Sequence, residues 1–152
     1  MYQRILVPHD GSDTARKALA SAIALAQESD GQIRLLHLME ELPYMGYEPY
    51  GAYYVDLLGS LRTAGKAILE DGMALAKSSG VAADCVLVDQ LGESLGNAVA
   101  KAATDWPADL IVVGTHGRRG VGRLFMGSGA EQIIRLAPIP VLVIRGNPPV
   151  AA

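Results

Sequence analysis

The stretch LIVVGTHGRRGVGRLFMGSGA, residues 110–130, decides the fold of this chain. It opens with an apolar β-type run, passes through a segment with six glycines and three arginines, and ends where helical periodicity begins. Glycine lets backbone N–H groups approach an anion closely, and a helix N-terminus adds unpaired donors and a partial positive charge. A strand, a glycine-rich loop and a helix in this order therefore predict a phosphate-binding site beyond the end of the strand.

Outward from this stretch, apolar runs alternate with helical periodicity along the whole chain. Strands are expected at residues 3–8, 33–39, 85–88, 110–113 and 141–144. Helices are expected from the Ser12 or Asp13 cap to Gly31, from about 56 to 79, from about 95 to before Trp106, and over 130–137. On the second helix the residues expected to face inward are Leu61, Ala64, Ile68, Leu69, Leu75 and Ala76.

Strands this continuously apolar are typical of a parallel sheet covered on both faces by helices. The pattern predicts a single α/β domain over residues 1–146, followed by a short tail at 147–152. Its sheet is expected to be open, five-stranded and parallel, in a Rossmann-like nucleotide-binding arrangement.

Composition excludes several classes of protein. Half of the 152 residues are apolar and 19% are charged, which is typical of a globular chain. No apolar run reaches the roughly 18–20 residues that cross a bilayer, and the N-terminal apolar run stops at Pro8, too early for a signal peptide. Cys85 is the only cysteine, and its apolar neighbours favour a buried, inert thiol. We therefore expect a cytoplasmic protein that does not associate with membranes.

The net charge of −3 is unevenly distributed. Residues 114–146 carry five arginines and one glutamate, a local charge of +4, which leaves −7 for the rest of the chain. One basic segment on a mildly acidic protein favours a small anionic ligand over nucleic acid. From charge alone, a solvated basic loop is an equally good interpretation.

A tyrosine-rich segment at residues 41–55 breaks the alternation. It holds five of the six tyrosines together with Pro43 and Pro49, and it is too long for a tight turn between a strand and a helix. A functional loop and a surface flap that packs its own rings both remain open.

Known catalytic and phosphate motifs are incomplete in this chain. Residues 122–128 have the outline of a P-loop without its lysine, and the dinucleotide pattern is not completed after Gly122. His37 lies in an apolar strand, where a satisfied core histidine is the more common case. His116 could reach a phosphate or serve the loop structurally. No carboxylate pair, metal-type spacing or nucleophile set is evident, so we expect at most slow hydrolysis of a bound nucleotide.

The glycine spacing Gly114-x2-Gly117-x9-Gly127-Ser128 resembles the signature of the ATP-binding universal stress proteins. The opening ILVPHDGS, residues 5–12, is similar to the first strand and loop of that family, and PVLVIR, residues 140–145, is similar to its last strand. The resemblance covers nearly the whole chain, with the tyrosine-rich segment the least typical part.

The resemblance implies the strand order 3-2-1-4-5 and an ATP site at the reversal between strands one and four, with Mg²⁺ carried on the phosphates. Asp10 would hydrogen-bond the ribose, with Pro8 and Leu38 near the adenine. The ribose and phosphate path would be lined by Val113, Gly114 and Gly117, and phosphate donors would come from Gly127, Ser128, Gly129 and Ala130. Position 9 of the same site is usually small or β-branched in the family and here is His9, whereas Gly129 replaces a common valine and would loosen the helix start.

The function implied is that of an ATP-binding regulatory or stress-response protein that forms a homodimer. The expected dimer pairs the apolar last strand with its own copy, because an uncovered edge strand exposes unpaired backbone groups. Its residues are Val141, Leu142, Val143 and Ile144. A nucleotide-free structural dimer of the same family remains an alternative. So does an enzyme of the ATP pyrophosphatase type, whose loop is faintly similar to residues 9–14, and Asp10 could also serve only the turn.

Overall fold

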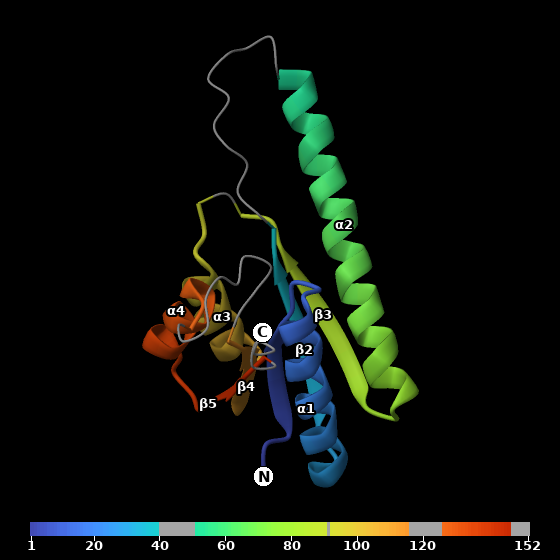
Figure 1. The fold of residues 1–152 in the computed structure, drawn as a ribbon, viewed down its shortest axis with the longest axis vertical. Coiled ribbons are helices and arrows are strands. Elements are labelled where there is room, and N and C mark those ends of the chain that lie inside the picture. Colours follow the sequence, from blue (N-terminus) through green and yellow to red (C-terminus); the bar gives the residue numbers. More distant parts are fainter. Residues whose placement is uncertain (40–50, 91, 116–125, 147–152) are drawn as a thin grey trace, which may run out of the picture.

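The computed structural model of the chain describes residues 1–39, 51–90, 92–115 and 126–146. The strands are β1 (Arg4–Pro8), β2 (Gln32–Leu38), β3 (Ala82–Val88), β4 (Leu110–Gly114) and β5 (Val141–Ile144). The helices are α1 (Asp13–Ser29), α2 (Gly51–Ser78), α3 (Leu95–Asp105) and α4 (Ser128–Leu136). The described strands form one parallel sheet in the order β3-β2-β1-β4-β5 (Figure 1), which confirms the predicted fold class and topology.

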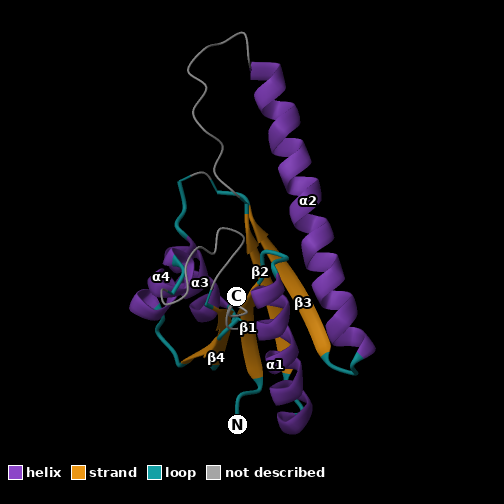
Figure 2. Ribbon diagram, in the orientation of Figure 1, coloured by secondary structure: helices purple, strands orange, loops and turns teal. Residues whose placement is uncertain are grey.

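Two helical layers enclose the sheet, with α1 and α2 on one face and α3 and α4 on the other (Figure 2). Side chains of the central strands alternate between these layers. Ile5 and Val7 of β1 pack on the α1 and α2 side, whereas Leu6 packs on the α3 and α4 side. Because both faces of β1, β2 and β4 are buried, these strands have the continuous apolar runs from which the parallel sheet was predicted.

The first helix begins as expected and ends differently. The Ser12 side chain caps α1 by accepting a hydrogen bond from the Ala15 N–H at 3.2 Å. The left-handed residue that ends the helix is Asp30, with φ of 54°, and not Gly31. Gly31 instead permits a close approach, since a Cβ there would lie 3.1 Å from the backbone oxygens of Tyr2 and Gln3. The prediction that Gly31 closes the helix conformationally is therefore wrong.

The second helix begins five residues earlier than predicted, so the last part of the tyrosine-rich segment is helical and not loop. Two positions expected to face inward, Ala64 and Leu75, are exposed. The buried stripe of α2 runs instead through Gly65, Leu69, Gly72 and Ala76. A search for apolar side chains misses this stripe because glycine, which has none, occupies two of its four positions.

Cys85 is exposed, which contradicts the expectation of a buried thiol. Strand β3 begins at Ala82, three residues earlier than predicted, and lies at the edge of the sheet, where part of each face is uncovered. Partial desolvation raises the pKa of the Cys85 thiol, and the carboxylates of Asp84 and Glu70 raise it further. The thiolate form of Cys85 is thus disfavoured, although the side chain is exposed.

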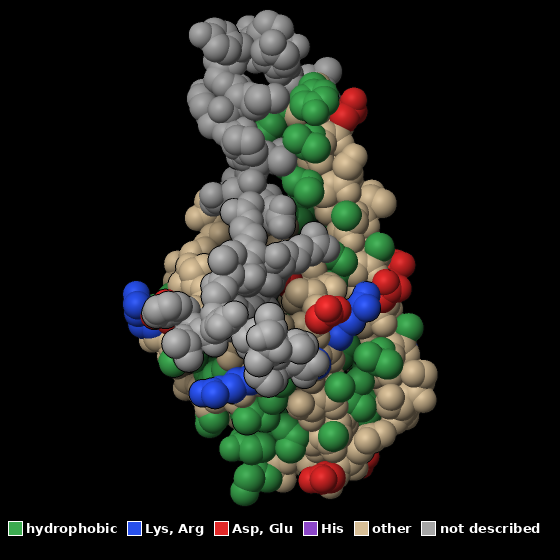
Figure 3. All heavy atoms as spheres, in the orientation of Figure 1, with side chains coloured by type: hydrophobic (Ala, Val, Ile, Leu, Met, Phe, Trp, Pro, Cys, Tyr) green, Lys and Arg blue, Asp and Glu red, His purple; other side chains and the backbone are tan. Residues whose placement is uncertain are grey.

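The outer surface is mixed in character. On the face shown in Figure 3, basic and acidic side chains are interspersed, and hydrophobic side chains lie along the first turns of α2. Tyr53 and Val55 are among the exposed apolar residues there. In Figure 1 these turns extend beyond the carboxyl ends of the strands. Among the residues that the structure describes, no helix is long and apolar enough to cross a membrane.

Candidate functional site

The carboxyl ends of β1 and β4 lie side by side at the centre of the sheet, where the strand order reverses. Pro8 ends β1 and Gly114 ends β4, and the chain leaves the two strands toward helices on opposite faces. The Gly127 N–H donates a hydrogen bond to the Thr115 carbonyl. This bond places the start of α4 next to the end of β4. The structure thus brings three predicted segments together, at residues 8–10, 113–114 and 127–130. Crevices of this kind bind ligands in open α/β sheets.

Asp10 is fixed in a turn. Its Oδ1 accepts a hydrogen bond from the Ser12 N–H at 2.9 Å, and Ser12 then caps α1. This contact supports the interpretation of Asp10 as a turn residue. It also holds the carboxylate in one orientation beyond β1, as a ribose-binding group requires.

Gly114 permits the close contact between β4 and the start of α1. A Cβ at this position would lie 2.6 Å from Thr14 Cγ2 and 2.9 Å from the Thr14 backbone oxygen. A backbone atom cannot move aside as a flexible side chain can, so only glycine fits here without a shift of α1. The glycine therefore fixes the β1–α1 loop relative to the end of β4.

The N-terminus of α4 differs from those of α1 and α3. Ser12 and Ser94 cap α1 and α3 with their side chains, whereas the N-cap of α4 is Gly127, for which no side-chain cap is found in the described part of the chain. The first-turn N–H groups of a helix have no intrahelical partners. Those of Ser128, Gly129 and Ala130 are therefore the backbone groups that could donate to an anion, and the phosphate-binding role of these residues stays a prediction.

Side chains in this first turn have different environments. Ser128 is exposed and its hydroxyl can join the backbone donors, whereas Ala130 is buried in the core between the sheet and α3. A Cβ at Gly129 would lie 2.8 Å from Leu95 Cδ2 of α3. Gly129 thus has a packing role against α3, in addition to any effect on the flexibility of the helix start.

The other predicted residues lie near this crevice or outside the described chain. Leu38 ends β2, the strand beside β1, and is half-buried. Val113 is buried under α3 and α4, so its backbone is the part that can line the site. Gly117 and the tyrosine-rich residues 41–50 lie outside the described residues. So does the segment 116–125, with three of the arginines.

Two buried histidines are neighbours in sequence of the predicted site residues: His9 lies between Pro8 and Asp10, and His37 precedes Leu38. His9 is 5% exposed and His37 is 7% exposed. His37 Nδ1 lies 2.9 Å from the His9 carbonyl oxygen, to which it donates, so His37 is a satisfied core histidine as predicted. The pKa of His9 is lowered, chiefly by burial, with the Asp10 carboxylate acting in the opposite direction.

Sequence reasoning treated His9 only as an unusual residue at a ligand-binding position. Its side chain in fact packs under α2, where Gly72 leaves room for it: a Cβ at Gly72 would lie 3.3 Å from His9 Cδ2. The spacing of Gly65 and Gly72, two turns apart on one helix face, is the sequence signal that could have indicated bulky side chains beneath α2.

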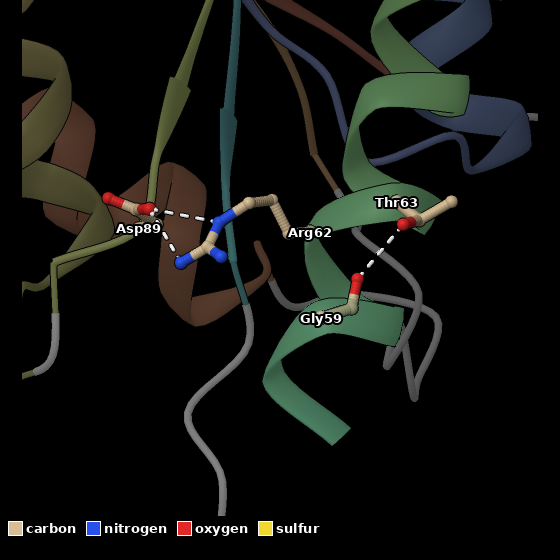
Figure 4. A network of polar contacts seen from close by, with 4 residues as sticks. All are labelled: Gly59, Arg62, Thr63 and Asp89. Atoms are coloured by element: carbon tan, nitrogen blue, oxygen red, sulfur yellow. Dashed lines mark hydrogen bonds and ion pairs between the residues drawn. The ribbon is translucent and has the colours of Figure 1, made fainter. Parts of the chain in front are cut away.

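The N-terminal half of α2 is attached to the end of β3. Arg62 Nη2 and Nε donate to Asp89 Oδ2 at 3.1 and 3.2 Å (Figure 4). One turn before Arg62, the Gly59 carbonyl accepts a hydrogen bond from the Thr63 hydroxyl. Within the described ranges no three metal-ligating side chains gather.

Comparisons with known proteins agree with this architecture. The model of the universal stress protein family matches residues 1–145. The universal stress protein in the QAH/OAS sulfhydrylase 3′ region of Thermus aquaticus is 36% identical over 146 residues, which cover 95% of this chain and 100% of that relative. A universal stress protein family structure from Burkholderia pseudomallei is 34% identical with a TM-score of 0.73, covering 94% and 96% of the two chains. A universal stress protein solved in complex with cAMP is 25% identical with a TM-score of 0.64, covering 95% and 97%. This chain belongs to the universal stress protein family.

Proposed function

We propose that this protein binds ATP or another adenine nucleotide at the crevice between β1 and β4 and acts as a dimeric regulatory factor in the cytoplasmic stress response. The observation that carries the proposal is the N-terminus of α4, where the described residues provide no side-chain cap and which follows β4, the neighbour of β1, whose end is followed by Asp10. The family relative bound to cAMP supports an adenine nucleotide as the ligand.

In this proposal, different residues contact the ribose, the adenine and the phosphates. Asp10 accepts hydrogen bonds from the ribose hydroxyls, and Pro8 and Leu38 lie beside the adenine. The backbone of Val113 and Gly114 lines the path to the phosphates. The phosphates occupy the first turn of α4, where N–H donors and the helix dipole favour negative charge. Mg²⁺ would be carried on the phosphates, since the described residues include no cluster of metal ligands.

Binding, with at most slow hydrolysis, is the chemistry that this site supports. A general base must lie within hydrogen-bond reach of the attacking water. His37 Nδ1 is occupied by the His9 carbonyl, and His9 Nδ1 is enclosed in the core. Pyrophosphate release with candidate acceptors would identify an enzyme of the pyrophosphatase type.

The hydrogen-bond pattern of the sheet edge supports the proposed homodimer through β5. Ile144 and Pro140 direct their carbonyls to β4, where they accept from Thr115 and Ile111. Alternate residues of a strand face opposite edges, so Val141 and Val143 present their N–H and C=O groups outward. β5 has β4 as its one neighbour in the described sheet, and Leu142 is 37% exposed. Pairing with a second β5 would satisfy these groups.

Calorimetric titration with ATP tests the site, with Asp10→Asn as the informative variant. The asparagine oxygen can still accept from the Ser12 N–H, so the turn is retained while the charge is lost. Charge-assisted hydrogen bonds are roughly twice as strong as neutral ones, so the affinity should fall about tenfold.

Asp13→Asn is the matched control, because it removes an equal charge three residues later at an exposed position of α1. Its affinity should stay within about twofold of the parent, since an exposed charge is well screened. Equal ATP affinity for Asp10→Asn and the parent would exclude Asp10 from the ribose site.

A further inference from the structure

The buried histidines connect the proposed ligand loop to the neighbouring strand. The His9 N–H donates to the Leu36 carbonyl at 2.8 Å, and the His9 carbonyl accepts from His37 Nδ1 at 2.9 Å. Both polar groups of the His9 backbone are therefore bound by β2. Asp10 is the next residue, so its position depends on these two contacts.

Helix α2 packs on both histidine rings at glycine positions, which place no side chain between the helix and each ring. A Cβ at Gly65 would lie 2.9 Å from His37 Cδ2, and one at Gly72 would lie 3.3 Å from His9 Cδ2. His9 Nδ1 is a buried nitrogen for which the described residues offer no hydrogen-bond partner. A proton added there would be enclosed in the core without an acceptor, which is costly.

The groups around His9 determine how it responds to pH. Among the described residues, the titratable and charged groups that face it are Asp10 on its own loop, His37 on β2 and Arg16 on α1. α2 contributes glycine at the contact, and its nearby charged residues Lys66, Glu70 and Asp71 are exposed. Burial, His37 and Arg16 disfavour a charged His9 and outweigh Asp10 and a hydrogen bond with the Ala15 backbone, so its pKa lies below the ordinary value of 6.5.

We propose that the histidine pair, His9 and His37, makes nucleotide binding sensitive to acid. With the His9 ring neutral, the pair holds the β1–α1 loop and Asp10 in the binding geometry. Protonation of His9 charges a site that α2 keeps closed, so the ring leaves it and the loop loses its contacts with β2. This inference rests on the proposed nucleotide site, whose ribose contact it regulates.

The lowered pKa of His9 determines the direction in which pH changes the stability of the protein and its affinity for AMP. The neutral form is favoured in the folded protein, so the stabilisation is complete above the unfolded-state pKa of about 6.5 and declines as the pH falls through the folded pKa. One linked proton changes an affinity by at most about tenfold per pH unit. For AMP binding, the relevant pKa is that of His9 in the folded, ligand-free protein, which lies below 6.5. The contribution of His9 to AMP affinity should therefore be constant from pH 8 to 7 and decline as the pH falls through this lower pKa.

The test compares the parent with His9→Val, which puts a residue of the family's usual type at this position. Calorimetry with AMP at pH 7.5 and pH 5.0 gives an affinity ratio for each protein. We expect the ratio of the parent to exceed that of His9→Val, by up to about tenfold for each pH unit below the His9 pKa. The AMP phosphate and His116 titrate in both proteins, so the comparison isolates His9. Equal ratios would overturn the proposal.

Two further measurements complete the test: the His9 pKa in the presence of AMP, and the unfolding of the ligand-free proteins in urea. In the parent, AMP should lower the His9 pKa measured by NMR, because coupling between two binding events is reciprocal. An unchanged pKa at saturating AMP would refute the regulation even if His9→Val failed to fold.

Ligand-free unfolding in urea separates this failure from that of the proposed function. The parent should lose more stability than His9→Val between pH 7.5 and pH 5.0. If no AMP binds at pH 7.5, the proposed function fails, while equal losses of stability in the two proteins would refute the acid sensitivity of His9 itself.

Discussion

Replacing Gly65 with alanine tests how closely α2 packs on the histidine pair, and Gly59→Ala in the same helix is its control. A Cβ at Gly59 has no other atom within 4 Å, whereas one at Gly65 would lie 2.9 Å from both His37 Cδ2 and Leu87 Cδ1. The leucine methyl can rotate away. The His37 ring cannot move without breaking its hydrogen bond to His9.

The magnitudes follow from these contacts. Alanine is favoured over glycine in a helix by about 0.5–1 kcal/mol, so Gly59→Ala should stabilise the protein by that amount. Gly65→Ala has the same gain, but overpacking costs about 1–3 kcal/mol and the lost hydrogen bond about 1 kcal/mol. The net result should be destabilisation by about 1–3 kcal/mol.

Urea unfolding of the parent and both variants at one protein concentration measures this difference. Gly65→Ala should also weaken AMP binding, because the ring that moves holds the residue before Asp10. If Gly65→Ala were as stable as Gly59→Ala, the close packing of α2 on His37 would be refuted, and with it the structural basis of the acid sensitivity.

Two further substitutions test the sheet edge and the crevice. Val143→Pro removes an outward N–H from β5 and should shift the protein toward monomer in sedimentation equilibrium. Val143→Thr keeps the N–H and the side-chain shape and should not change the assembly. A parent protein that sediments as a monomer at micromolar concentration would contradict the dimer. Gly114→Ala should destabilise the protein by about 1–3 kcal/mol in urea unfolding, because its Cβ would meet the Thr14 backbone at 2.9 Å. Unfolding at the parent's urea concentration would show that α1 has room to shift.

The strand order and the place of the crevice could be predicted because they depend on patterns that side chains display. The central strands contain runs of consecutive apolar residues, since helices cover both faces, and the glycine-rich stretch follows β4 in the sequence. Ser12 precedes an amphipathic run and therefore marks the start of α1.

The sequence predictions were wrong where a glycine packs without an apolar side chain, or where the exposure of a residue depends on segments that are distant in the sequence. Gly65 and Gly72 form half of the buried stripe of α2 without contributing an apolar side chain. Gly51 and the tyrosines that follow are poor helix formers, yet α2 begins there with Tyr53 and Val55 exposed, and the described contacts do not explain this early start. Cys85 lies in an apolar run, yet its strand is at the edge of the sheet, and strand position depends on contacts between distant segments. The contact between His9 and His37 depends in the same way on the pairing of β1 with β2.

The most direct test of adenine nucleotide binding is a calorimetric titration of the parent protein with AMP and with ATP in the presence of Mg²⁺ at pH 7.5. We expect saturable binding of one nucleotide per chain, at the proposed site between Asp10 and the first turn of α4, for which the described residues provide no side-chain cap. The absence of saturable binding of either nucleotide at millimolar concentration would contradict the proposed function and favour a nucleotide-free member of the family.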